Sequence, residues 1–184
     1  MFSETEKETT KSFSWKNELK EFISAAIWAV ILAFIIKTFI FQLTYVPTGS
    51  MIPTILPNDR VVVLKFWYKI KPIERGQIVV FEPPDSANSP PFIKRVIGLP
   101  GETLEIKNNT VYINGKPLKE NYLPAKMEME PFGPFKIPKD AIFVMGDNRQ
   151  HSADSRYFGA VPIKNIKGRA VLTYWPLNRV KVLR

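Results

Sequence analysis

An unbroken apolar run near the N-terminus limits the architectures open to this chain. Residues 22–41 read FISAAIWAVILAFIIKTFIF, with a single charge, Lys37, near the end. As an α-helix, such a run extends about 30 Å, which matches the hydrocarbon thickness of a bilayer. A helix of a soluble core would have a polar face, and residues 22–36 have almost none. The run therefore predicts a transmembrane helix.

The other interpretations of this run are a buried core helix and the apolar part of a cleaved signal sequence. The residues that follow the run, QLTY, lack the small side chains of a cleavage point. Lys11, Lys16 and Lys20 precede it, which predicts an N-terminus inside the cell and the remaining chain outside. The predicted parts are a cytoplasmic tail (1–21), a transmembrane helix (22–41) and an extracytoplasmic domain (42–184).

The long segment after the span has the pattern of a mainly β domain. Short runs rich in β-branched and aromatic residues alternate with turn signals, and no long amphipathic helix follows residue 42. In VYINGKPL, Asn114-Gly115 predicts a two-residue hairpin turn. A surface excursion is expected over about 103–139, because 119–139 is rich in Pro, Lys and Glu. The predicted strands are Arg60–Leu64, Gln77–Phe81, Phe92–Ile97, Thr103–Ile106, Thr110–Ile113, Ala141–Met145 and Arg169–Tyr174.

Composition excludes several kinds of site. The chain has no cysteine, so a disulfide scaffold, a thiol nucleophile and a cysteine-ligated metal are excluded. Its single histidine, His151, excludes a multi-histidine metal site and leaves one imidazole available as a base. The formal net charge of +9 indicates an anionic neighbour, either phospholipid or nucleic acid.

Three clusters contain residues suited to catalysis, and the first is residues 47–54, PTGSMIPT. Pro47 and Pro53 stiffen the turn around Ser50, and Gly49 permits close approach of the backbone. Such a turn can present a hydroxyl beside N–H groups aimed at one point. An ordinary Pro/Gly turn has the same composition.

The second cluster is residues 92–102, FIKRVIGLPGE. In a strand, Phe92, Lys94 and Val96 lie on one face. Burial of that face would lower the pKa of Lys94 and provide a neutral base. The alternative is a lysine on an edge strand whose amine reaches solvent.

The third cluster is residues 146–159, GDNRQHSADSRYFG, which follow an apolar strand. Such a polar loop is either a structural network of Asp–Arg pairs or the support of an active site. A serine nucleophile needs a base, and spacing alone leaves both His151 and Lys94 open.

In this order after one N-terminal span, the clusters resemble those of bacterial type I signal peptidases over about residues 20–184. GSMIPT resembles the nucleophile box, KRVIGLPGE the lysine box and GDNRQHSADSRYFGAVP the last box. RGQIVVF resembles a further box, with Gln77 where an aspartate is commoner. The resemblance implies a mainly β, signal-peptidase/SOS-repressor-like fold of coiled antiparallel sheets. It also implies a membrane-bound serine endopeptidase that removes signal peptides after small-x-small sites.

The resemblance also implies roles for individual residues. Ser50 would be the nucleophile and Lys94 the general base, without a metal or organic cofactor. Thr48 and the Ser50 N–H would form the oxyanion hole, Ser152 would orient the lysine amine, and His151 would be a bystander. The implied structural supports are Asp147, Arg149, Asp154 and Arg156, the last two as an ion pair, and the implied substrate-pocket residues are Thr44, Val46, Met51, Phe92 and Ile93.

Two other functions fit parts of the pattern. One is a different Ser/Lys protease, such as a self-cleaving repressor of the SOS type, against which the membrane span and the lack of a helix-turn-helix count. The other is a non-catalytic, membrane-anchored β module, in which Ser50→Ala would leave function intact. The expected partners are secretory preproteins and the phospholipid of a bacterial cytoplasmic membrane. Nucleic acid is not expected, because the chain has no nucleic-acid-binding motif.

Overall fold

One long helix begins the part of the chain that the structure describes. The computed structural model describes residues 15–84, 89–124 and 127–183. Helix α1 (Trp15–Ile35) continues into a π-helical turn, η1 (Ile36–Ile40). Within the described residues, one helical stretch, Glu18–Ile40, is long and apolar enough to cross a membrane. Its apolar window has a mean hydropathy of 2.3, and none of it is buried in the protein.

Helix α1 begins upstream of the apolar run, at a residue that the sequence predicted to lie in the tail. Residues 15–21 contain neither proline nor glycine, and their Leu, Lys and Glu residues favour helix. At the other end, Phe41 leaves the helix and begins a strand whose side chains alternate between exposed and half-buried. The apolar run therefore supplies both a helix and the first residue of a strand.

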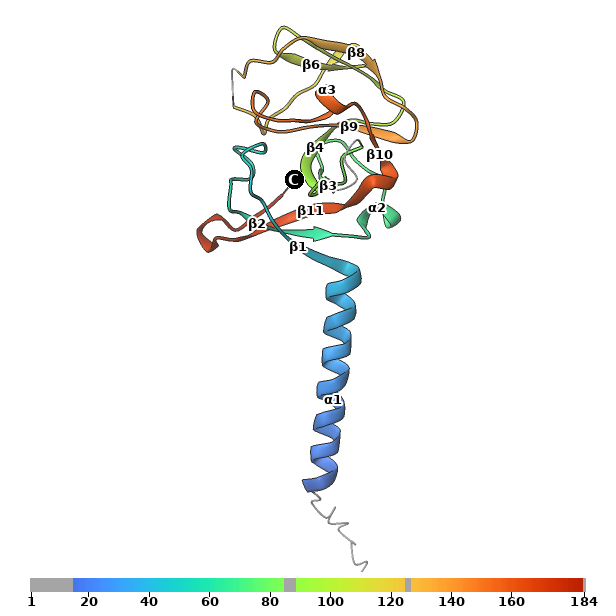
Figure 1. Ribbon diagram of the computed structural model, residues 1–184, viewed down its shortest axis with the longest axis vertical. Helices are drawn as coiled ribbons and strands as arrows, with labels where there is room; N and C mark the ends of the chain where they lie inside the picture. Colours follow the sequence, from blue (N-terminus) through green and yellow to red (C-terminus); the bar gives the residue numbers. More distant parts are fainter. Residues whose placement is uncertain (1–14, 85–88, 125–126, 184) are drawn as a thin grey trace, which may run out of the picture. The chain divides into compact units, whose positions relative to one another are not determined.

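A second compact unit begins at Phe39 and consists mainly of two antiparallel sheets, which confirms the predicted mainly β domain. The first sheet has the order β1 (Phe41–Tyr45), β2 (Arg60–Leu64), β11 (Ile166–Trp175), β3 (Ile78–Phe81), β4 (Phe92–Gly98), β9 (Ala141–Met145) and β10 (Val161–Pro162), and β12 (Lys181–Val182) pairs with β11. The second has the order β7 (Lys116–Pro117), β6 (Thr110–Ile113), β5 (Thr103–Lys107) and β8 (Phe132–Lys136). Within this unit, β6 and β8 lie beyond β9, away from β1 and β2 (Figure 1).

Short helical turns connect some of these strands. They are α2 (Trp67–Ile70), α3 (Ser155–Phe158), η2 (Ile163–Asn165) and η3 (Leu177–Arg179). No longer helix follows residue 42 in the described residues, which agrees with the sequence pattern.

Strand β11 bends the first sheet. It pairs with β2 through its C-terminal part and with β3 through its N-terminal part, and register shifts interrupt both ladders. Such bulges increase the local twist of a sheet. Gly168 lies at one shift, where an added Cβ would come within 2.4 Å of the Leu64 carbonyl oxygen. The first sheet is therefore curled, as the coiled antiparallel fold requires.

Strand β4 lies in the interior of the first sheet, between β3 and β9. Apart from half-buried Phe92, every residue of this strand is buried. Lys94 is therefore enclosed by neighbouring strands on both sides, and the alternative of a lysine on a solvated edge strand is wrong.

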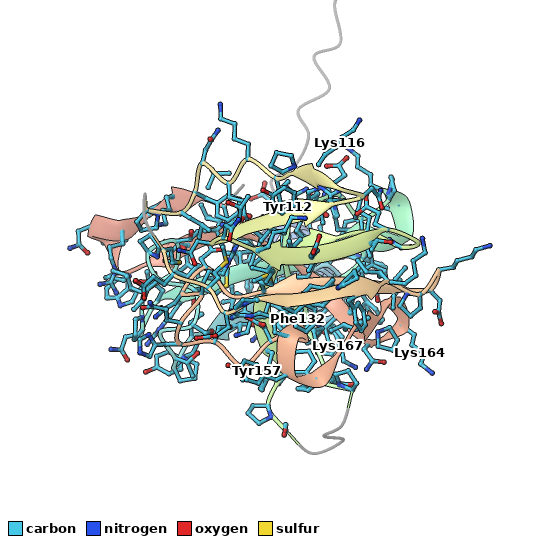
Figure 2. The ribbon with its side chains drawn as sticks, turned by 90° about the horizontal axis from the view of Figure 1, so that it is seen from above. Tyr112, Lys116, Phe132, Tyr157, Lys164 and Lys167 are labelled. Carbon is cyan, nitrogen blue, oxygen red and sulfur yellow. The ribbon has the colours of Figure 1, made fainter. Side chains whose placement is uncertain are left out.

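The second sheet forms part of the segment that the sequence predicted as a surface excursion. Asn114 and Gly115 both have positive φ, 50° and 77°, as the predicted two-residue turn requires. Strand β8 was not predicted, because PFGPFK reads as a proline-rich loop, yet it pairs with β5. Phe132 of β8 packs on buried Phe143, with ring centroids 5.4 Å apart. Figure 2 shows this sheet from above, with Tyr112 on β6.

Candidate active site

The turn that holds Ser50 connects β1 to β2, and its buried side chains pack in the hydrophobic core. Met51 and Ile55 are fully buried in the same hydrophobic cluster, and the Ile55 N–H donates to the Met51 carbonyl at 2.9 Å. The Val46 N–H donates to the Asp59 carbonyl at 2.9 Å, which joins the two ends of the turn. Ser50 is consequently held with only 7% of its surface exposed.

The Lys94 amine lies directly against the Ser50 hydroxyl. Lys94 Nζ donates a hydrogen bond to Ser50 Oγ at 2.6 Å, and Lys94 is only 4% exposed. The same amine lies 5.4 Å from the centroid of the Phe92 ring, on the face that the alternation of β4 predicts. Burial lowers the pKa of Lys94 from 10.5 to about 8, against the opposing effect of the Asp154 and Asp147 carboxylates.

The loop after β9 packs against the Ser50 turn through Gly146. A Cβ at this position would lie 2.4 Å from the Ser50 carbonyl oxygen and 2.2 Å from Ser152 Oγ, so only glycine fits. The Asn148 N–H donates to the Ser50 carbonyl at 3.0 Å, and the Asn148 side chain donates to the Gly49 carbonyl at 3.1 Å. These contacts set the distance between the two loops.

Asp154 and Arg156 form the ion pair that the resemblance implied. Arg156 Nε and Nη2 donate to the two carboxylate oxygens of Asp154 at 2.8 and 2.9 Å. The carboxylate also accepts from the Gly146 N–H at 2.9 Å, and Arg156 Nη2 donates to the Arg149 carbonyl at 2.7 Å. The pair thereby ties both ends of the loop together.

Asp147 and Arg149 each have a partner that the sequence did not reveal. Asp147 accepts two hydrogen bonds from Arg95, at 2.8 and 2.6 Å, and both side chains are almost completely buried. Arg149 pairs with Glu120, whose side chain is only 8% exposed. A charged residue next to Lys94 on a buried strand was the available signal for Arg95. The sequence contains no such signal for Glu120, because this residue lies in a segment with the composition of a surface loop.

Ser152 does not make the hydrogen bond to the lysine amine that the resemblance implied. It is 7% exposed, and its hydroxyl has no hydrogen-bond partner among the described residues. Its Oγ instead packs against the Cα side of Gly146, beside the Ser50 backbone. The Ser152 hydroxyl therefore lies near the Ser50 turn but is unpaired in this structure.

Thr48 and His151 have different relations to Ser50. Thr48 is exposed, and its Oγ1 lies 3.4 Å from Ser50 Oγ, within hydrogen-bond range. His151 is exposed, and its backbone N–H donates to the Asn148 carbonyl at 3.0 Å. Of the two bases that the spacing left open, the structure thus brings Lys94 into contact with Ser50.

A groove of about 500 Å³ opens at the Ser50–Lys94 pair. It contains four of the five residues implied as a substrate pocket, Thr44, Val46, Phe92 and Ile93. Met51 is different, because it is fully buried in the core below the turn and does not line the groove. The lining is mainly apolar, which suits small aliphatic side chains.

A serine hydroxyl hydrogen-bonded to a buried lysine amine beside an apolar groove is the arrangement of serine hydrolases that use lysine instead of a histidine triad. Comparison with known proteins gives the family. Residues 19–175 match the family described as "Signal peptidase, peptidase S26". The chain belongs to this family of signal peptidases.

Named relatives extend over most of the chain. A signal peptidase I of Leptolyngbya laminosa is 45% identical over 168 residues, 88% of this chain and 82% of the relative. Signal peptidase I S of Bacillus subtilis is 38% identical and covers 94% of this chain and 97% of its own. A crystal structure of a signal peptidase I from Enterococcus faecalis is 38% identical and covers 54% of this chain and 97% of that one, with a TM-score of 0.47.

Proposed function

We propose that this signal peptidase cuts secretory preproteins with Ser50 as nucleophile and Lys94 as general base. The family makes the chain a serine endopeptidase of the signal peptidase I type. The 2.6 Å hydrogen bond between the buried Lys94 amine and the Ser50 hydroxyl is the observation that supports these two roles most strongly. A pKa of about 8 leaves a usable fraction of the amine neutral near pH 7.

The reaction proceeds in two stages. Neutral Lys94 removes the Ser50 proton as the hydroxyl oxygen attacks the scissile carbonyl, and the protonated amine then supplies a proton to the leaving amine. Lys94 next activates a water, which hydrolyses the acyl-enzyme and regenerates the free serine. One group thus serves as base and acid in both stages.

The oxyanion hole consists of the Ser50 N–H and the Thr48 hydroxyl. The position of Thr48 Oγ1, 3.4 Å from Ser50 Oγ, supports this role, since the oxyanion forms next to the attacking oxygen. The networks around Asp147, Arg149 and Asp154 hold the loop that packs on the Ser50 turn. Ser152 orients the Lys94 amine once the bound substrate excludes water. A hydrogen bond to this amine would give the Ser152 hydroxyl, which is unpaired in this structure, a partner.

The signal peptide binds along the apolar end of the groove, next to Thr44, Val46, Phe92 and Ile93. An extended peptide places alternate side chains on the same side, so the residues at the first and third positions before the scissile bond face this wall. The shallow apolar lining suits small residues there, which gives the small-x-small preference.

Helix α1 anchors the protein in the bacterial cytoplasmic membrane. The exposed apolar surface of Glu18–Ile40 supports insertion into phospholipid, and anchoring enzyme and substrate in one membrane raises their effective concentration. We place residues 1–21 in the cytoplasm and the β domain outside. A reporter that is active only in the cytoplasm should be active when fused at residue 1 and inactive when fused at residue 184.

The test is cleavage of a purified preprotein with a small-x-small site, by the full chain in detergent and phospholipid. Wild type and His151→Ala should cut, whereas Ser50→Ala and Lys94→Ala should not. Retained cleavage by Lys94→Ala together with its loss in His151→Ala would establish a histidine base. If wild type failed to cut any preprotein, a non-catalytic binding module would become the better explanation.

A further inference from the structure

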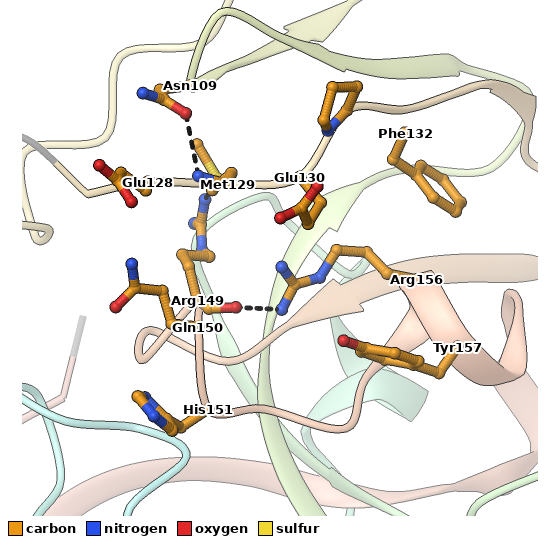
Figure 3. Close-up of a pocket in the computed structure, with 11 residues that line it drawn as sticks. Asn109, Glu128, Met129, Glu130, Phe132, Arg149, Gln150, His151, Arg156 and Tyr157 are labelled. Carbon is orange, nitrogen blue, oxygen red and sulfur yellow. Dashed lines mark hydrogen bonds between the residues drawn. The ribbon is translucent and has the colours of Figure 1, made fainter.

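A second cavity lies next to the catalytic groove. It has a volume of about 720 Å³, and Figure 3 shows the residues that line it, His151 among them. His151 also lines the groove. The loop after β9 supplies one wall of the second cavity, and Glu128, Met129 and Glu130 supply the opposite wall. No residue of β1 or β4 lines it. The second cavity therefore borders the groove at His151, which both linings contain.

The charges around the second cavity do not balance. Arg149 is paired with Glu120, and Arg156 is paired with Asp154, so each arginine charge is already compensated. Glu128 and Glu130 are exposed, and neither has an ion-pair partner among the residues that the structure describes. Among the described residues that line the cavity, these two carboxylates therefore supply negative charge that no ion pair compensates, and such charge attracts a cationic side chain.

The position of the second cavity relative to the groove determines which part of a substrate reaches it. In the proposed function, the signal peptide lies against β1 and the start of β4, on one side of Ser50 and Lys94. The chain beyond the scissile bond must then leave on the other side, where Asn148 and His151 line the groove. The second cavity borders the groove on that side, at His151.

We propose that this cavity binds the first residues of the mature protein, C-terminal to the scissile bond, and favours a lysine or arginine among them through Glu128 and Glu130. This inference rests on the proposed function and adds a specificity determinant to it. Because the glutamates are solvent-exposed, the preference is moderate and depends on ionic strength.

The experiment uses the full chain in detergent and phospholipid with peptides that share one small-x-small site. A single lysine or glutamate is moved through the residues that follow the bond, and kcat/KM is measured. At the best position, the lysine peptide should be cut about fivefold faster than the glutamate peptide at low salt. High salt should reduce this ratio.

The double variant Glu128→Gln/Glu130→Gln should bring the ratio of the two peptides close to one. A matched control, Glu82→Gln/Asp140→Asn, makes the same change in net charge at residues outside both cavities and should keep the wild-type ratio. Equal cutting of both peptides by wild type, or equal loss of preference in the control, would overturn the inference. Cleavage of neither peptide by wild type would instead contradict the proposed function.

Discussion

Replacing Lys94 by methionine should abolish cleavage and at the same time stabilise the protein. Burial lowers the pKa of this amine from 10.5 to about 8, which corresponds to about 3 kcal/mol of unfavourable free energy for the charged form. This cost is fully present below pH 8, where the amine is charged in both states. It disappears as the pH rises towards 10.5, because the unfolded state then loses its proton too.

Methionine fills similar space without a charge, and it gives up the hydrogen bond to Ser50, which is worth about 1 kcal/mol. The expected net gain for Lys94→Met is about 2 kcal/mol at pH 7. Urea unfolding of the full chain in a mild detergent, followed by tryptophan fluorescence, measures this difference at pH 7 and pH 10. The gain should be largely lost at pH 10.

The matched control is Lys116→Met, which removes the same charge from an exposed residue and should not reproduce the stabilisation of Lys94→Met. A Lys94→Met protein that is less stable than wild type at pH 7 would refute the reasoning. An equal stability difference at both pH values would refute it as well, because a desolvated amine requires the difference to change.

Substitutions at three other positions test the remaining parts of the site. Thr48→Val should reduce kcat by about a hundredfold, whereas Thr48→Ser should stay active, because only the hydroxyl is needed as an oxyanion donor. Steady-state kinetics on a preprotein measure kcat for both variants. Asp147→Ala leaves the buried Arg95 guanidinium without its carboxylate and should cost about 3–5 kcal/mol in urea unfolding. Gly146→Ala places a Cβ against the Ser50 carbonyl, so cleavage should fall even where circular dichroism shows a folded protein.

Strands with strong local patterns could be predicted from the sequence. RVVVL, TVYI and AIFVM became β2, β6 and β9 with the predicted bounds, because each alternates or is continuously apolar between turn signals. Strand β8 could not be predicted, since Pro134 within it and Pro131 just before it suggest a loop, and its partner β5 lies far away in the chain. Long-range pairing overrides local propensity in that case.

The site shows the same division between local and long-range information. The alternation of the strand predicted that Lys94 shares a face with Phe92, but it left open whether that face is buried, and the pairing of β4 with β3 and β9 decides this. Its contact with Ser50 joins residues far apart in sequence, and spacing alone had left His151 equally open. Glu120 lies in a segment of polar composition, so its buried pairing with Arg149 could not be predicted. Such a contact depends on tertiary packing.

The pH dependence of kcat/KM is the most direct test that Lys94 is the base for Ser50. Cleavage of a preprotein by wild type should rise with pH and level off above an apparent pKa of about 8, the value to which burial lowers this amine. His151→Ala should leave that limb in place. A limb near the ordinary pKa of histidine, about 6.5, that is lost in His151→Ala would contradict the assignment of Lys94 as the base.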